Sequence, residues 1–333
     1  MYDEGHELTE RELEKLERRI ASVYREAAKD MDAKIAEYFE VFEKRDAEMR
    51  ELIGKKVNGK TWTEADYKQW RLAQIGRGER YVALRDQLAE RMTDANIVAT
   101  SYINDSTSNI YSLNRNYAAY TIEQVSGNVG FTLWDESTAK RLITEQPDLM
   151  PYYPPEKALK RGIDLAWGKQ MISSQMTQGI LQGETLKQLT NRLQKNVPSM
   201  NRDSAIRAAR TATTSAQNAG RMDSYAAAEK LGIHVRKRWV ATKDGRTRDA
   251  HRLLDGQVVD WDEPFSSELG KIRYPGDPQA YPSNIYNCRC TLRTVDGTEA
   301  EPRKMRVRDA DGKYMLVNEM TYAEWQEWVK NRG

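Results

Sequence analysis

The sequence predicts an α+β protein that is mostly α-helical, with a long N-terminal helix and a small irregular β region near the C-terminus. Three features indicate this fold class. Residues 7–53 lack Gly and Pro and repeat apolar residues every three or four positions, as one long amphipathic helix does. Residues 203–231 are crowded with Ala, Thr and Ser, which predicts a closely packed helix. After Gly232, apolar and polar residues alternate, which is typical of a strand.

The composition limits the class of protein. The 333 residues suffice for two domains with a core, and the mean hydropathy of −0.81 indicates many solvated helices. The sequence contains no run of about 18 apolar residues that could cross a membrane, and its first residues lack the basic and apolar segments of a secretory signal. Two cysteines exclude a disulfide framework and suit a reducing cytoplasm.

Residues 1–150 are predicted to form a helical domain. Thr9 and Glu12 offer a capping box for the first helix. Its apolar stripe has near-heptad spacing and consists of Leu13, Leu16, Ile20, Val23, Ala27, Met31, Ile35, Tyr38 and Phe42. A stripe this long needs a partner helix, either in the same chain or in a second copy, so self-association is one expectation.

Later elements of this domain follow from turn and capping residues. Residues 54–60 break the first helix, and a second is predicted from Thr63 past Gly76 and Gly78 to about residue 95. Residues 97–125 are also predicted to be helical. Residues 127–134 form a predicted loop, and Ser137 is the expected N-cap of a helix ending near residue 143.

Residues 151–295 are predicted to form a second domain, in which helices precede a small β region. Prolines between residues 147 and 155 indicate a linker. Helices are expected over 156–181, 185–194 and 203–231, and strands over 233–240, 257–259 and 288–292. Residues 296–333 complete the chain with a hairpin over 307–317, whose turn is Asp311-Gly312, and a helix over 321–330.

The most specific pattern lies between Arg238 and Leu292. It reads Trp239-Val240-Ala241-Thr242-Lys243-Asp244, then Thr247-Arg248 and His251, then Asp255-Gly256, and finally Asn287-Cys288-Arg289-Cys290, with Phe265 and a Tyr274–Pro278 turn between them. This order resembles the phage head morphogenesis domain of the phage Mu F type, found in minor head proteins of tailed bacteriophages. Upstream, the resemblance continues more diffusely through Gly183–Leu193, Arg210-Thr211 and Asn218–Arg221, so that roughly residues 160–295 match.

The resemblance implies a virion protein and not an enzyme. It implies a location inside the head near the portal, with the host cytoplasm as the place of assembly, and a role in head assembly and DNA packaging and delivery. Expected partners are the portal protein, capsid or scaffold proteins and double-stranded DNA. The residues that match the family's pattern, and that we expect to specify its fold, are Trp239, Asp244, Arg248, Asp255, Gly256 and Asn287.

The charge distribution fits a DNA neighbour. Residues 151–250 carry 18 Lys and Arg against 8 Asp and Glu, whereas residues 1–50 carry 10 against 15. A basic surface binds phosphates by releasing counterions and does so independently of base sequence. The alternative is a solvated helical surface that is basic without binding DNA.

The cysteines and one histidine are candidate metal ligands. Cys288 and Cys290 would face the same side of a strand, and with His251 they could hold a structural zinc, with Asp244 or Asp255 as a fourth ligand. The spacing differs from the usual Cys-x2-Cys knuckle. The alternative is that the two cysteines are small buried residues and that His251 hydrogen-bonds a nearby carboxylate.

A second functional class remains open, namely a metal-dependent nuclease or other hydrolase that acts on DNA. His251 would be its general base and Asp244 or Asp255 its orienting partner. The sequence supplies no nucleophile motif, phosphate loop or cluster of metal-binding carboxylates for it.

Overall fold

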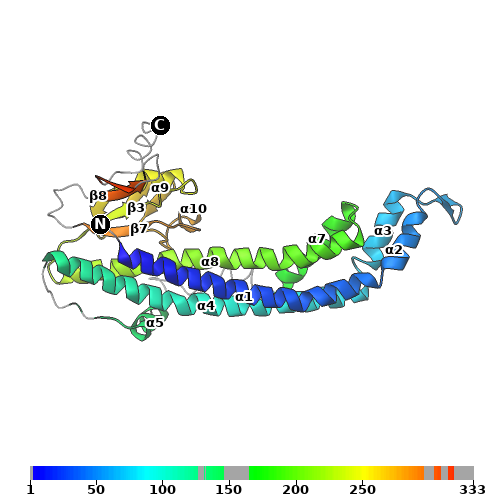
Figure 1. The fold of residues 1–333 in the computed structure, drawn as a ribbon, viewed down its shortest axis with the longest axis horizontal. Coiled ribbons are helices and arrows are strands. Elements are labelled where there is room, and N and C mark those ends of the chain that lie inside the picture. The colour runs from blue at the N-terminus through cyan, green and yellow to red at the C-terminus, as the bar shows by residue number, and fades with distance from the viewer. Residues whose placement is uncertain are drawn as a thin grey trace. The chain divides into compact units, whose positions relative to one another are not determined.

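The computed structural model describes residues 3–126, 131, 133–145, 165–295, 304–308 and 314–318, and it confirms the predicted class (Figure 1). The chain divides into two compact units, each built from separate stretches of sequence. The motif unit comprises Met1–Leu16, Ile103–Tyr153 and Arg207–Gly333, and the helical unit comprises Glu17–Tyr102 and Pro154–Ile206. The predicted linker at 147–155 lies outside the described residues, so the domain limits proposed from the sequence stay predictions.

The first predicted helix is two helices in the structure. α1 spans Glu4–Glu40 and α2 spans Glu43–Glu51, so the prediction of one helix through residue 53 was wrong. The chain turns at residues 41 and 42, where the amide of Phe42 donates to the carbonyl of Phe39 at 2.9 Å. The ring of Tyr38 packs on Phe39 and Phe42 with centroids 5.3 Å apart in each pair, and this aromatic contact holds the turn.

The apolar stripe of α1 is buried, as its spacing predicts. Seven of its nine members are buried, namely Leu13, Leu16, Ile20, Ala27, Met31, Ile35 and Tyr38. In the helical unit its partners come from the same chain: Tyr24 donates to Asn96 of α4 (Glu79–Ser126) at 2.5 Å, and Asn96 donates to Asn201 of α8 (Leu186–Lys230) at 3.1 Å. Self-association through α1 remains a prediction.

Asp3 starts α1, and Thr9 does not. The carboxylate of Asp3 accepts from the amide of His6 at 3.0 Å, as an N-cap does. Thr9 lies inside the helix, where its hydroxyl donates to the carbonyl of Gly5 and accepts from Asn114 of α4, both at 2.7 Å. The predicted capping box at Thr9 was therefore wrong because an acidic residue upstream fills the same role.

A short hairpin and a helix follow in the helical unit. β1 (Lys56–Val57) and β2 (Lys60–Thr61) pair antiparallel across Asn58 and Gly59, both with positive φ, which is the preferred chemistry for a two-residue turn. α3 (Glu64–Gln74) begins at the predicted Thr63 with a complete capping box. The predicted continuous helix to residue 95 is interrupted at 75–78, where the amides of Ile75 and Gly76 both donate to the carbonyl of Arg71 and end α3. Gly76 lies close against Ile180 of α7 (Leu165–Leu181).

Two further predictions need correction. α5 (Glu136–Glu145) is capped by Asp135, which accepts from the amide of Thr138 at 2.8 Å, and not by Ser137. α8 joins the two helices predicted over 185–194 and 203–231 and contains Pro198. A proline inside a helix removes one hydrogen bond at a cost of about 3 kcal/mol. The buried side chains of Leu189, Leu193 and Val197 continue the apolar face up to this point and offset that cost.

The β region lies in the motif unit. β3 (Arg236–Val240) is the central strand of a three-stranded antiparallel sheet, between β4 (Val258–Asp260) and β7 (Thr291–Val295). β5 (Phe265–Ser267) pairs with β6 (Gly270–Ile272), and two short helices lie between strands, α9 (Asp249–Leu254) and α10 (Pro282–Ile285). β8 (Lys304–Arg308) and β9 (Tyr314–Asn318) form the predicted hairpin. Its turn and the predicted helix over 321–330 lie outside the described residues.

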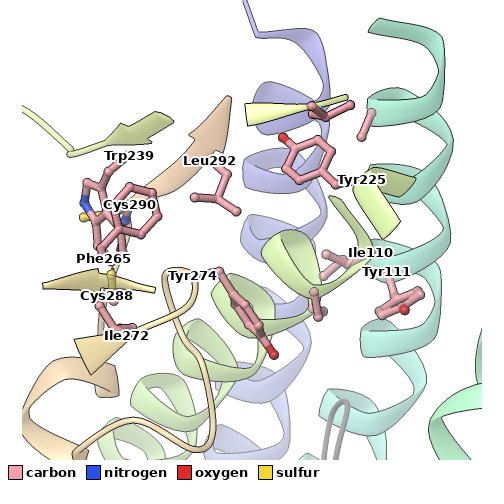
Figure 2. Packing of buried hydrophobic residues seen from close by; sticks show 14 of the residues in the cluster. Ile110, Tyr111, Tyr225, Trp239, Phe265, Ile272, Tyr274, Cys288, Cys290 and Leu292 are labelled. Carbon is pink, nitrogen blue, oxygen red and sulfur yellow. Dashed lines mark hydrogen bonds between the residues drawn. The ribbon is translucent and has the colours of Figure 1, made fainter. Parts of the chain in front are cut away.

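The core of the motif unit joins this sheet to the helices (Figure 2). Gly220 of α8 permits the closest approach, because a Cβ there would clash with the carbonyl oxygen of Tyr111 and lie 3.1 Å from the amide nitrogen of Arg115. Gly232 ends α8 with a φ of +82°, as predicted for a C′ residue. No described helix is long and apolar enough to span a bilayer.

Candidate functional site

The motif residues gather around Trp239, which is fully buried on β3. Its indole ring meets the rings of His251 and Phe265 edge to face, with centroids 5.3 Å apart in each case. Figure 2 shows both cysteines beside Trp239 and Phe265. Strand β3 brings Trp239 inward because alternate residues of a strand face opposite sides, and Lys237 and Trp239 share the buried side.

His251, Cys288 and Cys290 form one cluster. The Nδ1 atom of His251 lies 3.5 Å from the Cys288 sulfur and 3.6 Å from the Cys290 sulfur. All three ligand atoms lie within 4.8 Å of one another, and all three side chains are buried. The cysteines precede β7 and do not lie in it as predicted. The two side chains still face the same side, as predicted. The Cys290 amide donates to the Cys288 sulfur at 3.4 Å, which keeps the turn between them tight.

The other ring nitrogen of His251 contacts an amide. Nε2 lies 3.1 Å from the Oδ1 atom of Asn284 on α10, where a carboxylate was the expected alternative. The Nδ2 atom of Asn284 donates to the carbonyl of Leu269 at 3.3 Å and to the hydroxyl of Ser267 at 3.2 Å. No sequence pattern marks Asn284, which lies in a Pro-Ser-Asn-Ile segment.

The two thiols differ in acidity. The hydrogen bond from Cys290 lowers the pKa of the Cys288 thiol well below its ordinary value, and the His251 ring acts in the same direction against the effect of burial. The pKa of Cys290 is raised by the adjoining Cys288 and by burial, whereas the Trp239 indole favours its ionised form. Cys288 is therefore the first of the pair to ionise.

Asp244 and Asp255 build turns and do not join the cluster. Asp244 pairs with Arg289 at 2.7 Å, and the Arg289 hydrogen bond holds the pKa of this carboxyl far below its usual range. Asp255 accepts from the amide of Ala241 at 2.9 Å. Gly256 has a φ of +80° and donates to the carbonyl of Trp239 at 2.9 Å, which leads the chain into β4. The prediction that either carboxylate supplies a fourth ligand was wrong.

Arg248 and Asn287 fix the two loops that flank the cluster. The Arg248 guanidinium donates to the carbonyl of Tyr286 and so ties the start of α9 to the turn after α10. Asn287 has a φ of +56°, and its amide donates to the hydroxyl of Thr211 on α8 at 3.0 Å. Both residues therefore hold these loops in place, and their role in specifying the fold stays a prediction.

Polar residues of α8 hold the cysteine segment in place. Thr214 donates to the carbonyl of Cys288 at 2.5 Å. Asn218 accepts from the Leu292 amide at 2.9 Å and donates to the carbonyls of Pro275 and Cys290. The small-residue pattern of α8 predicted close packing, but the sequence did not show that Thr214 and Asn218 satisfy the backbone of a segment more than 70 residues later.

Arg221 of α8 extends this network to the N-terminus. Its guanidinium pairs with both carboxylate oxygens of Asp3 at 2.8 Å and donates to the carbonyl of Leu292 at 2.6 Å. It also donates to Asn114 at 3.1 Å. Burial raises the pKa of the Asp3 carboxyl, but the charge and hydrogen bonds of Arg221 outweigh burial and hold the pKa below its ordinary value.

Lys237 is a second buried cation near the cluster. Its Nζ atom donates to the carbonyl of Trp261 at 2.6 Å and lies 5.5 Å from the centre of the Phe265 ring. Burial lowers the pKa of the Lys237 ammonium to about 8, although Asp262 acts in the opposite direction. The sequence placed Lys237 on a strand without indicating that it faces inward.

The geometry favours a structural role for this site. The ring nitrogens of His251 face Asn284 and the cysteines, so its orienting partner is an amide and not Asp244 or Asp255, which the hydrolase interpretation assigned to this role. A general base must also reach substrate, and His251 is 1% exposed. Two soft sulfurs and an imidazole nitrogen are instead a ligand set that suits zinc.

Comparison with known proteins agrees with the motif. Residues 170–293 match the family model described as Phage Mu protein F like protein. The minor head protein GP7 of Bacillus phage SPP1 is 32% identical over 216 residues, which are 64% of this chain and 67% of that protein. The chain belongs to the phage Mu F-like family of minor head proteins.

Two other proteins share shorter segments with this Mu F-like chain. The Mu-like prophage FluMu F protein of Haemophilus influenzae is 28% identical over 76 residues, which are 23% of this chain and 16% of that protein. A protein of Enterococcus faecalis named NAD(+)–arginine ADP-ribosyltransferase EFV is 30% identical over 164 residues, which are 49% of this chain and 32% of that protein. No solved structure matches the chain.

Proposed function

We propose that this Mu F-like chain is a structural component of the phage head that lies beside the portal inside the virion. In this role it acts in head assembly and in DNA packaging and delivery, without catalytic turnover. The SPP1 relative, named a minor head protein and aligned over 67% of its length, supports the proposal.

The observation that carries the proposal is the inward orientation of the motif. Trp239, His251, Cys288 and Cys290 are each no more than 2% exposed. A catalytic group must reach its substrate, whereas a group that holds a fold together is normally buried. The motif is therefore better suited to fixing a scaffold than to turning over a substrate.

The proposed partners are the portal protein, capsid or scaffold proteins, and a second copy of this chain. The test is to co-express the full chain with the portal protein and to isolate complexes by size, and in parallel to purify heads assembled with and without portal protein. We expect the chain to co-purify with the portal and to be absent from heads that lack it. Normal incorporation into portal-free heads would exclude the portal as the partner that recruits the chain.

DNA contact is proposed for the exposed basic residues of α8. Lys187 and Lys195 are both exposed in the helical unit. Because phosphate binding releases counterions, affinity should fall steeply with salt and be the same for unrelated DNA sequences. The double variant Lys187→Glu/Lys195→Glu should lower the salt slope by about 1 for each phosphate that the protein no longer neutralises.

The matched control for DNA binding is Lys29→Glu/Lys34→Glu. These two exposed lysines lie on α1, in the same unit, and the control makes the same change in net charge. We expect it to retain most of the affinity, measured by fluorescence anisotropy across a salt series. Equal weakening in both double variants, or affinity that does not change with salt, would contradict a DNA surface on α8.

The absence of turnover has its own test. The full chain is incubated with NAD+ and arginine-containing acceptors, and separately with plasmid DNA and divalent metals, each beside the His251→Ala variant. We expect no product above the rate of the variant in either assay. Activity that depends on His251 would replace the structural proposal with an enzymatic one.

A further inference from the structure

The side chains around His251 determine which of its ring nitrogens carries the proton. The Leu269 carbonyl can only accept a hydrogen bond, so the Nδ2 atom of Asn284, 3.3 Å away, must face it. The Oδ1 atom of Asn284 therefore faces Nε2 of His251 at 3.1 Å, and Nε2 must be the donor. The neutral ring then presents an unprotonated Nδ1 to the two cysteine sulfurs.

Two sulfurs converge on this one lone pair. They lie 3.5 and 3.6 Å from Nδ1, but the lone pair lies in the ring plane and can accept only one good hydrogen bond. Without a metal, only one of the two thiols can donate to Nδ1, although both sulfurs lie almost equally close to it. A cation between the three atoms would be contacted by all of them at once.

The distances fit a tetrahedral zinc ion. Zinc–nitrogen and zinc–sulfur bonds are about 2.0–2.3 Å long, so a nitrogen and a sulfur bound to the same tetrahedral zinc lie roughly 3.6 Å apart. The two observed separations match this value. The geometry is thus already that of a ligand set.

Charge balance and a buried indole support the same conclusion. Each thiol releases one proton to solvent when the metal binds, so two thiolates and one neutral imidazole compensate the two positive charges of Zn²⁺. A neutral cluster suits a site in which all three ligands are buried. The Trp239 N–H is buried without a nitrogen or oxygen acceptor among the described residues, and a donor beside the cysteines suits metal-bound thiolates.

We propose that His251 Nδ1 and the thiolates of Cys288 and Cys290 bind one structural zinc ion, with Asn284 as the positioning residue for the histidine. Among the described residues no Asp, Glu or further His or Cys joins the set, so three protein ligands leave a fourth position that a water molecule can fill. The zinc joins α9, which carries His251, to the segment that leads into β7, which carries Cys288 37 residues later.

The first experiment measures metal in the full chain purified under reducing conditions with its affinity tag removed. We expect about one zinc per chain by elemental analysis. X-ray absorption should show two sulfur and two nitrogen or oxygen neighbours. Replacement by Co²⁺ should give thiolate charge-transfer absorption and tetrahedral visible bands. Folded protein that neither retains zinc nor gives the cobalt spectrum would overturn the proposal, as would iron or copper in place of zinc.

Variants separate metal binding from packing. Cys288→Ser should lose the zinc, and a strong chelator should lower the melting temperature of the wild type towards that of the variant. If Cys288→Ser fails to fold, Asn284→Ala decides the question. Loss of a positioning residue should weaken zinc affinity ten- to a hundredfold, measured by competition with a chromophoric chelator, while the cobalt spectrum persists.

The matched control is His234→Gln. The His234 side chain is 63% exposed and lies near Glu229 and Asp260, so it offers an alternative surface site for zinc. We expect this variant to bind zinc with unchanged affinity. Loss of zinc in His234→Gln but not in Cys288→Ser would assign the metal to the surface and refute the buried site.

Discussion

Lys237 makes the stability of the motif unit depend on pH in a calculable way. The ordinary lysine pKa is 10.5, and burial lowers the pKa of Lys237 in the folded protein to about 8. Between these values the unfolded chain holds one proton more than the folded chain, so the free energy of unfolding rises with pH. Below pH 8 both states are protonated, and the folded state bears the full cost of a buried charge.

The magnitude follows from the difference in pKa. At about 1.4 kcal/mol per unit, the shift corresponds to about 3 kcal/mol between the two limits. About 2 kcal/mol of this should develop between pH 6.5 and pH 9.5, because the unfolded lysine remains mostly protonated at the upper value. The free energy of unfolding therefore rises with pH, whereas it would fall with pH for a lysine whose pKa is raised by a partner.

The assay compares the wild type with Lys237→Met by urea unfolding at four pH values, monitored by tryptophan fluorescence. All other titrating groups are common to both proteins, so the difference between their free energies of unfolding isolates Lys237. Replacement of the exposed Lys271 by Met is the control and should show no such trend. A difference that stays constant from pH 6.5 to 9.5 would refute the buried-charge argument.

Two other substitutions test the contacts among the helices of the motif unit. Gly220→Ala should destabilise the protein by about 2–3 kcal/mol in chemical denaturation, because the new methyl group clashes with the Tyr111 carbonyl, whereas Gly245→Ala, with open space around it, should be nearly neutral. Asp3→Asn should cost about 3–5 kcal/mol, because it leaves the buried charge of Arg221 without its anion. Since the folded pKa of Asp3 is lowered, this loss should be constant above the ordinary pKa of 3.8 and disappear only as the pH falls through the lower folded value. Equal stability of Asp3→Asn and wild type at neutral pH would show that the ion pair contributes nothing.

The sequence predicted features that depend on local periodicity. The stripe from Leu13 to Tyr38 is buried, and the alternation around Trp239 is a strand, because a period of three to four or of two residues is a property of neighbouring positions alone. A local rule failed at the start of α1. The capping-box rule indicated Thr9, but Asp3 caps the helix from upstream, and Thr9 lies inside the helix in contact with Asn114 of α4.

The candidate site was predictable in its members but not in its partners. His251, Cys288 and Cys290 were grouped from their chemistry, and they do come together. From the sequence, Asp244 was a candidate fourth ligand. In the structure its carboxylate forms an ion pair with Arg289, the residue between the two cysteines. Asn284 approaches His251 across 33 residues of chain, and no sequence pattern encodes a contact of that kind.

The ion pair between Asp3 and Arg221 can form only late in synthesis, because it joins the two ends of a long stretch of chain. The two residues are 218 positions apart, so at roughly 5–20 residues per second Asp3 is synthesised about 10–40 s before its partner Arg221. Throughout that interval the first turns of α1 lack the hydrogen bonds and ion pair that Arg221 makes with Asp3. Such late, long-range closure is slow and leaves apolar surface exposed to aggregation. Chains arrested before residue 221 should therefore be targets for chaperones and proteases, and only nearly complete chains should enter assembly.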